Sequence, residues 1–108
     1  MINARKELLE KVKELPAIKC ALITYGDEFL DADCKKTIVL REKYSAPEYE
    51  AFLSQLNFTY DSGFGGQELF GSVWLEDGTW LERGEYDGSE WWEHKECPEI
   101  PDILRRLP

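Results

Sequence analysis

The sequence predicts an α+β fold: a mostly antiparallel sheet with a C-terminal three-stranded meander, and two helices packed on one face. Two observations lead to it. Short strand-like runs joined by turns are kept separate from two amphipathic helical segments. The pairs Asp77-Gly78 and Asp87-Gly88 each divide two strand-like runs, and Asp-Gly favours hairpin turns. A chain of 108 residues can bury one modest core, so we expect a single domain over residues 1–108.

The first expected element is an amphipathic helix over residues 4–15. Its apolar residues recur from Leu8 at spacings of four and three, while lysines and glutamates occupy the other positions. Asn3 can cap the first turn, and Pro16 ends the helix because it disfavours helical geometry in the residue before it.

Two strands and a second helix follow. The apolar, β-branched run 18–25 predicts a buried strand, and 37–44 predicts its neighbour across the acidic segment 26–36. In the next helix, Ser45 is the expected N-cap, and Glu48 three residues later completes a capping box.

The second half of the chain is expected to be mainly strands. A short strand at 58–60 and a glycine-rich connection at 62–66 lead into the meander, with strands at 68–76, 79–86 and 90–96. Pro98 and Pro101 indicate an extended exit, after which a last helical turn is expected at 103–107.

Pairing within the meander depends on its two loops. A two-residue turn at Asp77-Gly78 would pair Leu75 with Trp80 and Trp74 with Leu81. At the second turn the same geometry would place Glu85 opposite Glu90, and like charges in that position are destabilising. We therefore expect a four-residue loop there.

The longer second loop pairs Tyr86 with Trp91, and Glu82 with Lys95. In strand 79–86, Leu81, Arg83 and Glu85 then share one face, while the even-numbered residues share the other. These registers lead us to expect the residues around the first hairpin in the core: Trp74, Leu75, Trp80 and Leu81. The expected working surface is the opposite end of the meander, with Tyr86, Trp91 and Trp92 among glutamates.

Charge narrows the classes of partner. The net charge is −9, and residues 67–99 alone carry ten acidic and two basic residues. Such a surface repels phosphate backbones and anionic membranes, so we expect no direct nucleic-acid and no membrane partner. The charged N-terminus is not a signal peptide, and three cysteines without a CxxC motif favour reduced thiols in the cytoplasm.

Four chemical readings of these residues have simpler alternatives. Paired carboxylates among Glu76, Glu82, Glu85, Glu90 and Glu93 could support glycoside hydrolysis, but a solvated acidic face is the favoured explanation, because acids this frequent form close pairs by chance. The aromatic residues of the meander could stack on sugars, or could form core.

A zinc site would draw on Cys20, Cys34, His94 and Cys97, although their spacing is not that of a structural zinc motif. The acidic segment lacks the EF-hand register. We therefore expect no metal, no other cofactor and no catalytic residues.

One stretch resembles known sequences. Tyr60–Gly63, Asp77–Trp80, Glu85–Trp92 and Pro98–Pro101 are similar to a stretch of small uncharacterised acidic accessory proteins of tailed phages and enterobacterial prophages. The resemblance covers roughly the last half of the chain and carries over no catalytic residue. It implies a protein that binds and blocks a host protein.

These observations favour a non-enzymatic accessory protein that binds and modulates a bacterial host protein with a basic surface. Anti-defence activity in the host cytoplasm would fit this role, with the protein acting as a monomer or homodimer. Aromatic anchors and glutamates that steer a basic partner would form the interface. The expected partner-binding residues are Tyr86, Glu85, Glu90, Trp91, Trp92 and Glu93. Two alternatives remain open: a small carbohydrate- or metabolite-binding domain, and a small hydrolase that uses paired glutamates.

Overall fold

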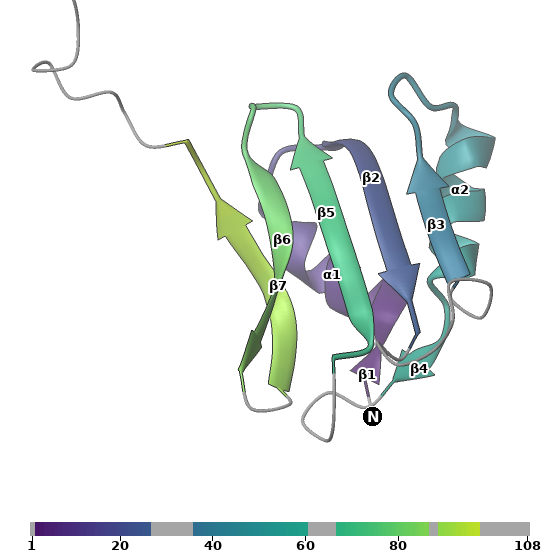
Figure 1. The fold of residues 1–108 in the computed structure, drawn as a ribbon. Helices are drawn as coiled ribbons and strands as arrows, with labels where there is room; N and C mark the ends of the chain where they lie inside the picture. Colours follow the sequence, from purple (N-terminus) through teal and green to yellow (C-terminus); the bar gives the residue numbers. More distant parts are fainter. Residues whose placement is uncertain (1, 27–35, 61–66, 87–88, 98–108) are drawn as a thin grey trace, which may run out of the picture.

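The computed structural model describes residues 2–26, 36–60, 67–86 and 89–97, which form two helices, a five-stranded antiparallel sheet and a two-stranded sheet (Figure 1). The large sheet has the order β3-β2-β5-β6-β7, and its strands are β2 Ile18–Tyr25, β3 Lys36–Leu40, β5 Leu69–Leu75, β6 Trp80–Tyr86 and β7 Ser89–Lys95. The helices are α1 Ala4–Val12 and α2 Ala46–Gln55, and the small sheet pairs β1 Ile2–Asn3 with β4 Thr59–Tyr60. The predicted α+β class with its C-terminal meander is confirmed.

Helix α1 begins as its sequence predicts and ends earlier. The Asn3 side chain accepts a hydrogen bond from the Lys6 amide at 2.9 Å, as expected of an N-cap. The helix ends at Val12 instead of residue 15, and the Leu15 amide donates to the Val12 carbonyl in a tighter, three-residue turn. Pro16 follows that turn directly, which accounts for its geometry.

Helix α2 has the predicted capping box. The Glu48 amide donates to Ser45 Oγ at 3.3 Å, and the Ser45 amide donates to Glu48 Oε1 at 3.2 Å. The strand before it stops at Leu40 rather than at Tyr44. The chain turns there through Lys43, which has φ +60°, and the Tyr44 hydroxyl donates to the Ile18 carbonyl at 2.5 Å.

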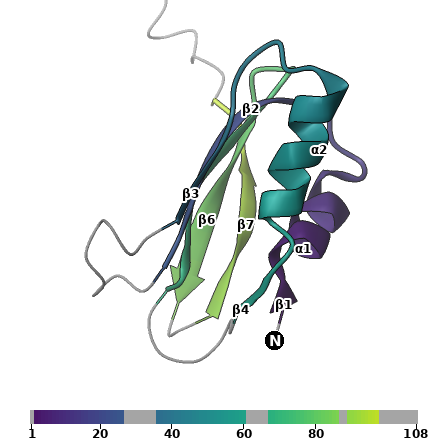
Figure 2. The ribbon, with the colours of Figure 1, turned by 90° about the vertical axis from the view of Figure 1, so that its right-hand side faces the viewer.

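The core lies between the helices and one face of the large sheet. Figure 2 shows α1 and α2 on the same side of that sheet, as predicted from the segregation of helices and strands. Leu8 from α1 and Phe52 from α2 are buried against sheet residues that include Ile23, Val73 and Leu81. The opposite face of the sheet has no helix over it among the described residues (Figure 2).

The first hairpin has a three-residue loop, so the predicted two-residue turn is wrong. Trp74 pairs with Trp80, Val73 pairs with Leu81, and the Leu75 amide donates to the Thr79 carbonyl at 2.9 Å. The last loop residue, Gly78, has φ +88°, the left-handed geometry that closes a three-residue hairpin loop. This register places both tryptophans on the same face of the sheet.

In the second hairpin the predicted loop is too long, whereas in the first it was too short. Tyr86 pairs with Ser89 and Glu85 pairs with Glu90, so only two residues separate the strands, and the predicted four-residue loop is wrong. Glu82 pairs with Glu93 rather than with Lys95. The Glu85–Glu90 pair is tolerated because the Glu90 carboxylate turns to the covered face and meets Arg83 there.

Four expected segments fall outside the described residues: the extended exit at Pro98 and Pro101, the helical turn at 103–107, the glycine-rich connection at 62–66, and nearly all of the acidic segment 26–36. Of the helices that are described, neither has the length and apolar character needed to cross a membrane.

Candidate functional site

The uncovered face of the large sheet is the candidate site, and we call it the open face. Strand residues alternate between the two faces, so the open face receives every second side chain of the five strands. Large apolar side chains lie exposed on it, with exposed fractions of 47% for Leu22, 48% for Val39, 42% for Trp74, 77% for Tyr86 and 40% for Trp91. Several large exposed apolar side chains on one face of a small protein are typical of an interaction surface.

The strand registers arrange the open face in three rows across the sheet. One aromatic row pairs Trp74 with Trp80. Over β5, β6 and β7 the middle row is polar and runs through Ser72, Glu82 and Glu93. The same row continues into Leu22 of β2 and Val39 of β3. Beyond it, Trp91 pairs with Gly84, which has no side chain to project from that position. Two carboxylates therefore lie between two aromatic rows.

Gly84 fixes the position of Trp91. A Cβ atom at residue 84 would lie 2.6 to 2.9 Å from the indole atoms Nε1, Cε2 and Cζ2 of Trp91, so the ring must lie across the glycine backbone. Aromatic residues pack in this way over glycines in the neighbouring strand. The open face thus presents an indole that is held in place and is still substantially exposed.

Glu82 is the most constrained carboxylate of the open face. Lys95 Nζ lies 3.2 Å from Glu82 Oε2, and Trp80 Nε1 donates to Glu82 Oε1 at 3.0 Å. The bond from Lys95, and then the bond from Trp80, lower the pKa of Glu82 below its ordinary value. Glu82 therefore stays ionised and already has a cation beside it.

Beneath the sheet, a second polar cluster joins β6 and β7 to α1 and β4. Arg83 Nη2 donates to Glu90 Oε1 at 2.7 Å and to the Tyr60 hydroxyl at 2.9 Å, and Arg83 Nη1 donates to Glu7 Oε1 at 3.1 Å. The Arg83 and Glu90 side chains are at most 2% exposed. The guanidinium lies 4.9 Å from the centre of the Trp92 ring, close enough for a cation–π contact.

Glu90 and Tyr60 have further partners in this cluster. The two carboxylate oxygens of Glu90 accept hydrogen bonds from the backbone amides of Glu68, at 2.9 Å, and Leu69, at 3.0 Å. Burial, and next the hydrogen bond that Tyr60 donates to Glu7, raise the pKa of Tyr60 well above its ordinary value. The buried charges are thus paired and hydrogen-bonded, which fits a cluster that orders α1 and β4 against the sheet.

The six predicted partner-binding residues divide between the two faces. Tyr86, Trp91 and Glu93 lie on the open face, while Glu85 is exposed on a strand position that points the other way. Trp92 is 3% exposed and Glu90 is 4% exposed, so neither lies on the surface where we expected it. Adjacent residues of a strand point to opposite faces, so Trp91 and Trp92 could not both be exposed on one face.

The predicted division of the tryptophans by hairpin is also wrong. Trp74 is exposed and Trp80 is partly buried on the open face, whereas the buried tryptophan is Trp92. The other two residues predicted for the core, Leu75 and Leu81, are buried. The sheet therefore separates the tryptophans by face and not by hairpin.

Leu22 and Val39 are open-face residues that the sequence did not indicate. They pair with each other in adjacent strands, β2 and β3, and both are nearly half exposed. Their strands read as continuous apolar runs, a pattern typical of strands buried on both sides. No alternation in these runs could have identified the exposed positions.

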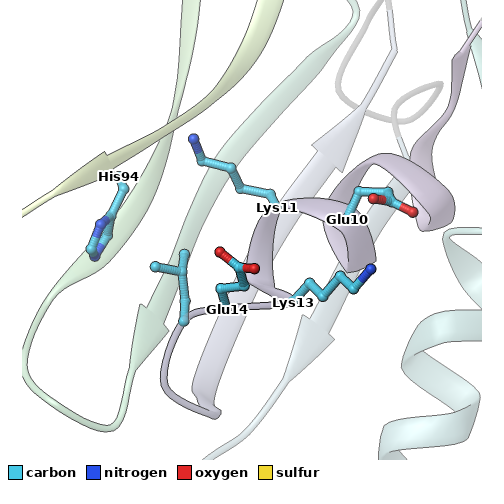
Figure 3. A pocket seen from close by; sticks show the side chains of 6 residues that line it. Glu10, Lys11, Lys13, Glu14 and His94 are labelled. Atoms are coloured by element: carbon cyan, nitrogen blue, oxygen red, sulfur yellow. The ribbon is translucent and has the colours of Figure 1, made fainter.

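A hollow of about 390 Å³ lies between α1 and β7 (Figure 3). Its walls carry Glu10, Lys11, Lys13, Glu14, Leu15 and His94. Two lysines balance two glutamates, so the hollow selects neither anions nor cations. His94 Nε2 lies 2.9 Å from Thr79 Oγ1, within hydrogen-bonding distance.

The cysteines and the acidic residues do not assemble a metal centre among the described residues. No group of three or more histidine, cysteine, aspartate or glutamate side chains comes together there, and Cys34 is outside the described part of the chain. Cys20 lies partly buried in β2, in register with Trp74. Burial, and then the nearby Glu42 carboxylate, raise the pKa of the Cys20 thiol, which disfavours the reactive thiolate.

Comparisons of the chain with protein-family models, with curated proteins and with solved structures found no match.

Proposed function

We propose that this chain is a non-enzymatic binding protein whose open face docks onto another protein. The observation that supports it most directly is the exposed apolar set Leu22, Val39, Trp74, Tyr86 and Trp91 on a sheet face that no described helix covers. Aromatic side chains at the centre of an interface supply much of its binding energy. The carboxylates between the aromatic rows add electrostatic selectivity.

The partner that suits this face is a bacterial host protein with a basic surface. The net charge of −9 would speed association with such a partner and repel acidic competitors. The resemblance of the second half of the chain to phage and prophage accessory proteins supports a host protein as the target. On this proposal the chain works in the bacterial cytoplasm, as a monomer or homodimer, and modulates the protein that it binds.

Affinity capture from bacterial lysate tests the proposal with matched variants. The wild-type protein and Glu50→Gln, a change on the helix side of the sheet, should recover the same partner at low and physiological salt. Trp91→Ser and Trp74→Ser should lose it, because each removes an exposed indole from the open face. Recovery of nothing above background at either salt concentration, or equal recovery by all four proteins, would contradict the proposal.

Carbohydrate binding is the second candidate function. The supporting observation is the indole of Trp91, which lies across Gly84 in the same strand that carries Glu82. Planar aromatic side chains beside carboxylates suit the apolar faces and hydroxyl groups of sugars. Screening against glycans and nucleotides tests this candidate, and a flat response across both sets would reject it.

The hydrolase alternative has less support than either binding function, because Glu82 and Glu90 are poor candidates for a general acid. A glycosidase needs one carboxylic acid whose pKa is raised. The pKa of Glu82 is lowered, and Glu90 is buried against Arg83 and two backbone amides. Neither residue suits the part of a general acid.

A further inference from the structure

The open face has one carboxylate more than its lysine can neutralise. Glu82 and Glu93 lie directly opposite each other in β6 and β7, and like charges in that position repel. Lys95 forms an ion pair with Glu82. The Glu93 side chain is exposed, and among the described residues it forms no ion pair or side-chain hydrogen bond. A partner that brings one positive charge to this position would complete the pairing.

The position beside Glu93 is already shaped for a flat cation. Trp91 lies two residues away on the same strand and therefore on the same face. Its ring is held across Gly84 and is 40% exposed, so it offers an ordered aromatic surface. Indoles attract cations over their faces more strongly than other aromatic rings do.

We propose that the partner inserts an arginine side chain whose guanidinium stacks on Trp91 and bonds to the Glu93 carboxylate. This inference rests on the proposed docking function of the open face and specifies the partner's chemistry. A guanidinium is planar, carries its charge at all relevant pH values and presents paired N–H groups that match a carboxylate. A lysine ammonium could approach Glu93, but it has no flat surface to lay on the indole.

The apolar residues of the open face indicate that apolar side chains should lie next to the arginine in the partner. Trp74 and Trp80 lie in the row next to Glu82 and Glu93, while Leu22 and Val39 continue the Glu82–Glu93 row toward the other edge of the sheet. Apolar partner residues next to the arginine would therefore be buried against the two tryptophans, and more distant ones against Leu22 and Val39. A second copy of this chain is less suited to bind the open face, since two chains that each have a net charge of −9 repel each other.

Peptide titration monitored by NMR tests this inference. The probe is Ac-Leu-Ser-Arg-Ser-Leu-NH₂, in which an extended conformation places the arginine and both leucines on one side. The comparison peptide carries citrulline, which is flat and uncharged, in place of arginine. The four indole N–H signals report the position of binding, and the buried Trp92 serves as the internal reference.

The arginine peptide should shift the Trp91 and Trp80 signals, leave the Trp92 signal in place, and bind more weakly as salt is added. Glu93→Gln should weaken binding about threefold to tenfold, and Trp91→Ser about tenfold or more. The control Glu50→Gln makes the same charge change on α2 and should leave binding unchanged.

Equal binding of the citrulline peptide, or no effect of Glu93→Gln, would overturn the arginine proposal. So would concentration-dependent shifts of the same indole signals without peptide, because they would identify a second copy as the occupant. If lysate capture still depends on Trp74 and Trp91 in such a case, the docking function stands and only the arginine fails. If lysate capture also fails, the docking function fails with it.

Discussion

Arg83 is the residue with the largest number of distinct chemical partners beneath the sheet. Its guanidinium reaches two carboxylates and the Tyr60 hydroxyl, its Nε donates to the Leu69 carbonyl at 3.3 Å, and its flat face lies over Trp92. Buried ion pairs are costly to form, and they are costlier still when one partner is removed. The intact cluster therefore adds little net free energy of unfolding, whereas a substitution that removes one of its charges should lower that free energy strongly.

Glu90→Gln tests that effect at the level of one charge. The substitution keeps the side-chain shape but leaves Arg83 without its shortest ion pair, so the free energy of unfolding should fall by about 3 kcal/mol. Urea denaturation measures the loss. Glu42→Gln breaks the Lys19–Glu42 pair, in which both side chains are about half exposed, and should cost less than about 0.5 kcal/mol. Similar losses in the two variants would contradict the assigned role of Glu90.

Gly84→Ala tests how Trp91 is held. The new methyl group would overlap the indole, which is a side chain and can swing outward, so stability should change by less than about 1 kcal/mol. Acrylamide quenching of Trp91 fluorescence should increase, and the arginine peptide should bind more weakly.

Gly71→Ala is the matched comparison for this change. There a Cβ would lie 2.2 Å from the Leu22 carbonyl oxygen, at a residue with φ +136°, and the backbone cannot move aside as a side chain does. We expect a loss of at least about 2 kcal/mol from this variant. If Gly84→Ala were as destabilising as Gly71→Ala, the indole of Trp91 would be fixed by more than its contact with Gly84.

At the scale of elements, the loop of the first hairpin decides which side chains reach the open face. Asp77 Oδ1 accepts hydrogen bonds from the Thr79 amide at 2.9 Å and from the Thr79 hydroxyl at 2.5 Å, which stabilises the turn. The bond from the hydroxyl, and then the bond from the amide, lower the pKa of Asp77 below its ordinary value of 3.8.

This lowered pKa makes the stability of the turn depend on pH. An aspartate whose pKa is lower in the folded state stabilises the fold above its ordinary pKa, and the contribution disappears as the pH falls through the folded value. The difference in unfolding free energy between wild type and Asp77→Ala should therefore be constant from neutral pH down to about pH 5, and should shrink below pH 3.8. Chemical denaturation at a series of pH values measures it, with Ser54→Ala as the control whose difference stays constant. An unchanged difference for Asp77→Ala at pH 2.5 would contradict the role given to its carboxylate.

The elements themselves could be predicted from the sequence because each has a local signal. Asn3, Ser45 and Glu48 mark helix starts through their own hydrogen bonds, and strand β2 was predicted with its observed bounds. The registers could not be predicted, because each depends on a distant partner. The Glu85–Glu90 pair seemed unfavourable until Arg83 and the backbone of β5 were known to surround Glu90. The two-residue strand β1 lacks any pattern of its own and exists through its pairing with β4.

The prediction of the site had a different limit. Tyr86, Trp91 and Glu93 were predicted as partner-binding residues because aromatic and acidic residues stand out in the last two strands, and all three lie on the open face. Trp74 was predicted for the core because apolar pairs were expected on both faces near the first hairpin, whereas one face of the sheet has no described helix over it. The composition of the chain favoured a binding protein, and only the folded sheet shows which of its apolar and acidic side chains are exposed on one face.

At the scale of the whole molecule, the two faces of the large sheet differ in what covers them. One face holds the core, and the other carries apolar side chains that have no described layer over them (Figure 2). Leu22 and Leu81 allow a direct test, since they are the same residue type in the same sheet. Leu22 is 47% exposed on the open face and Leu81 is completely buried under the helices.

Leu81→Ala should lower the free energy of unfolding by about 2–5 kcal/mol, because it removes buried methyl groups and leaves a cavity. Leu22→Ala should change it by less than about 1 kcal/mol, since much of that side chain is already in water. Urea denaturation gives both values. Lysate capture should rank the two variants the other way. Leu22→Ala should weaken recovery of the partner, whereas Leu81→Ala protein that remains folded should recover it better than Leu22→Ala does. If Leu22→Ala were as destabilising as Leu81→Ala and had no effect on capture, the open face would serve the fold rather than a partner, and the docking proposal would lose its main support.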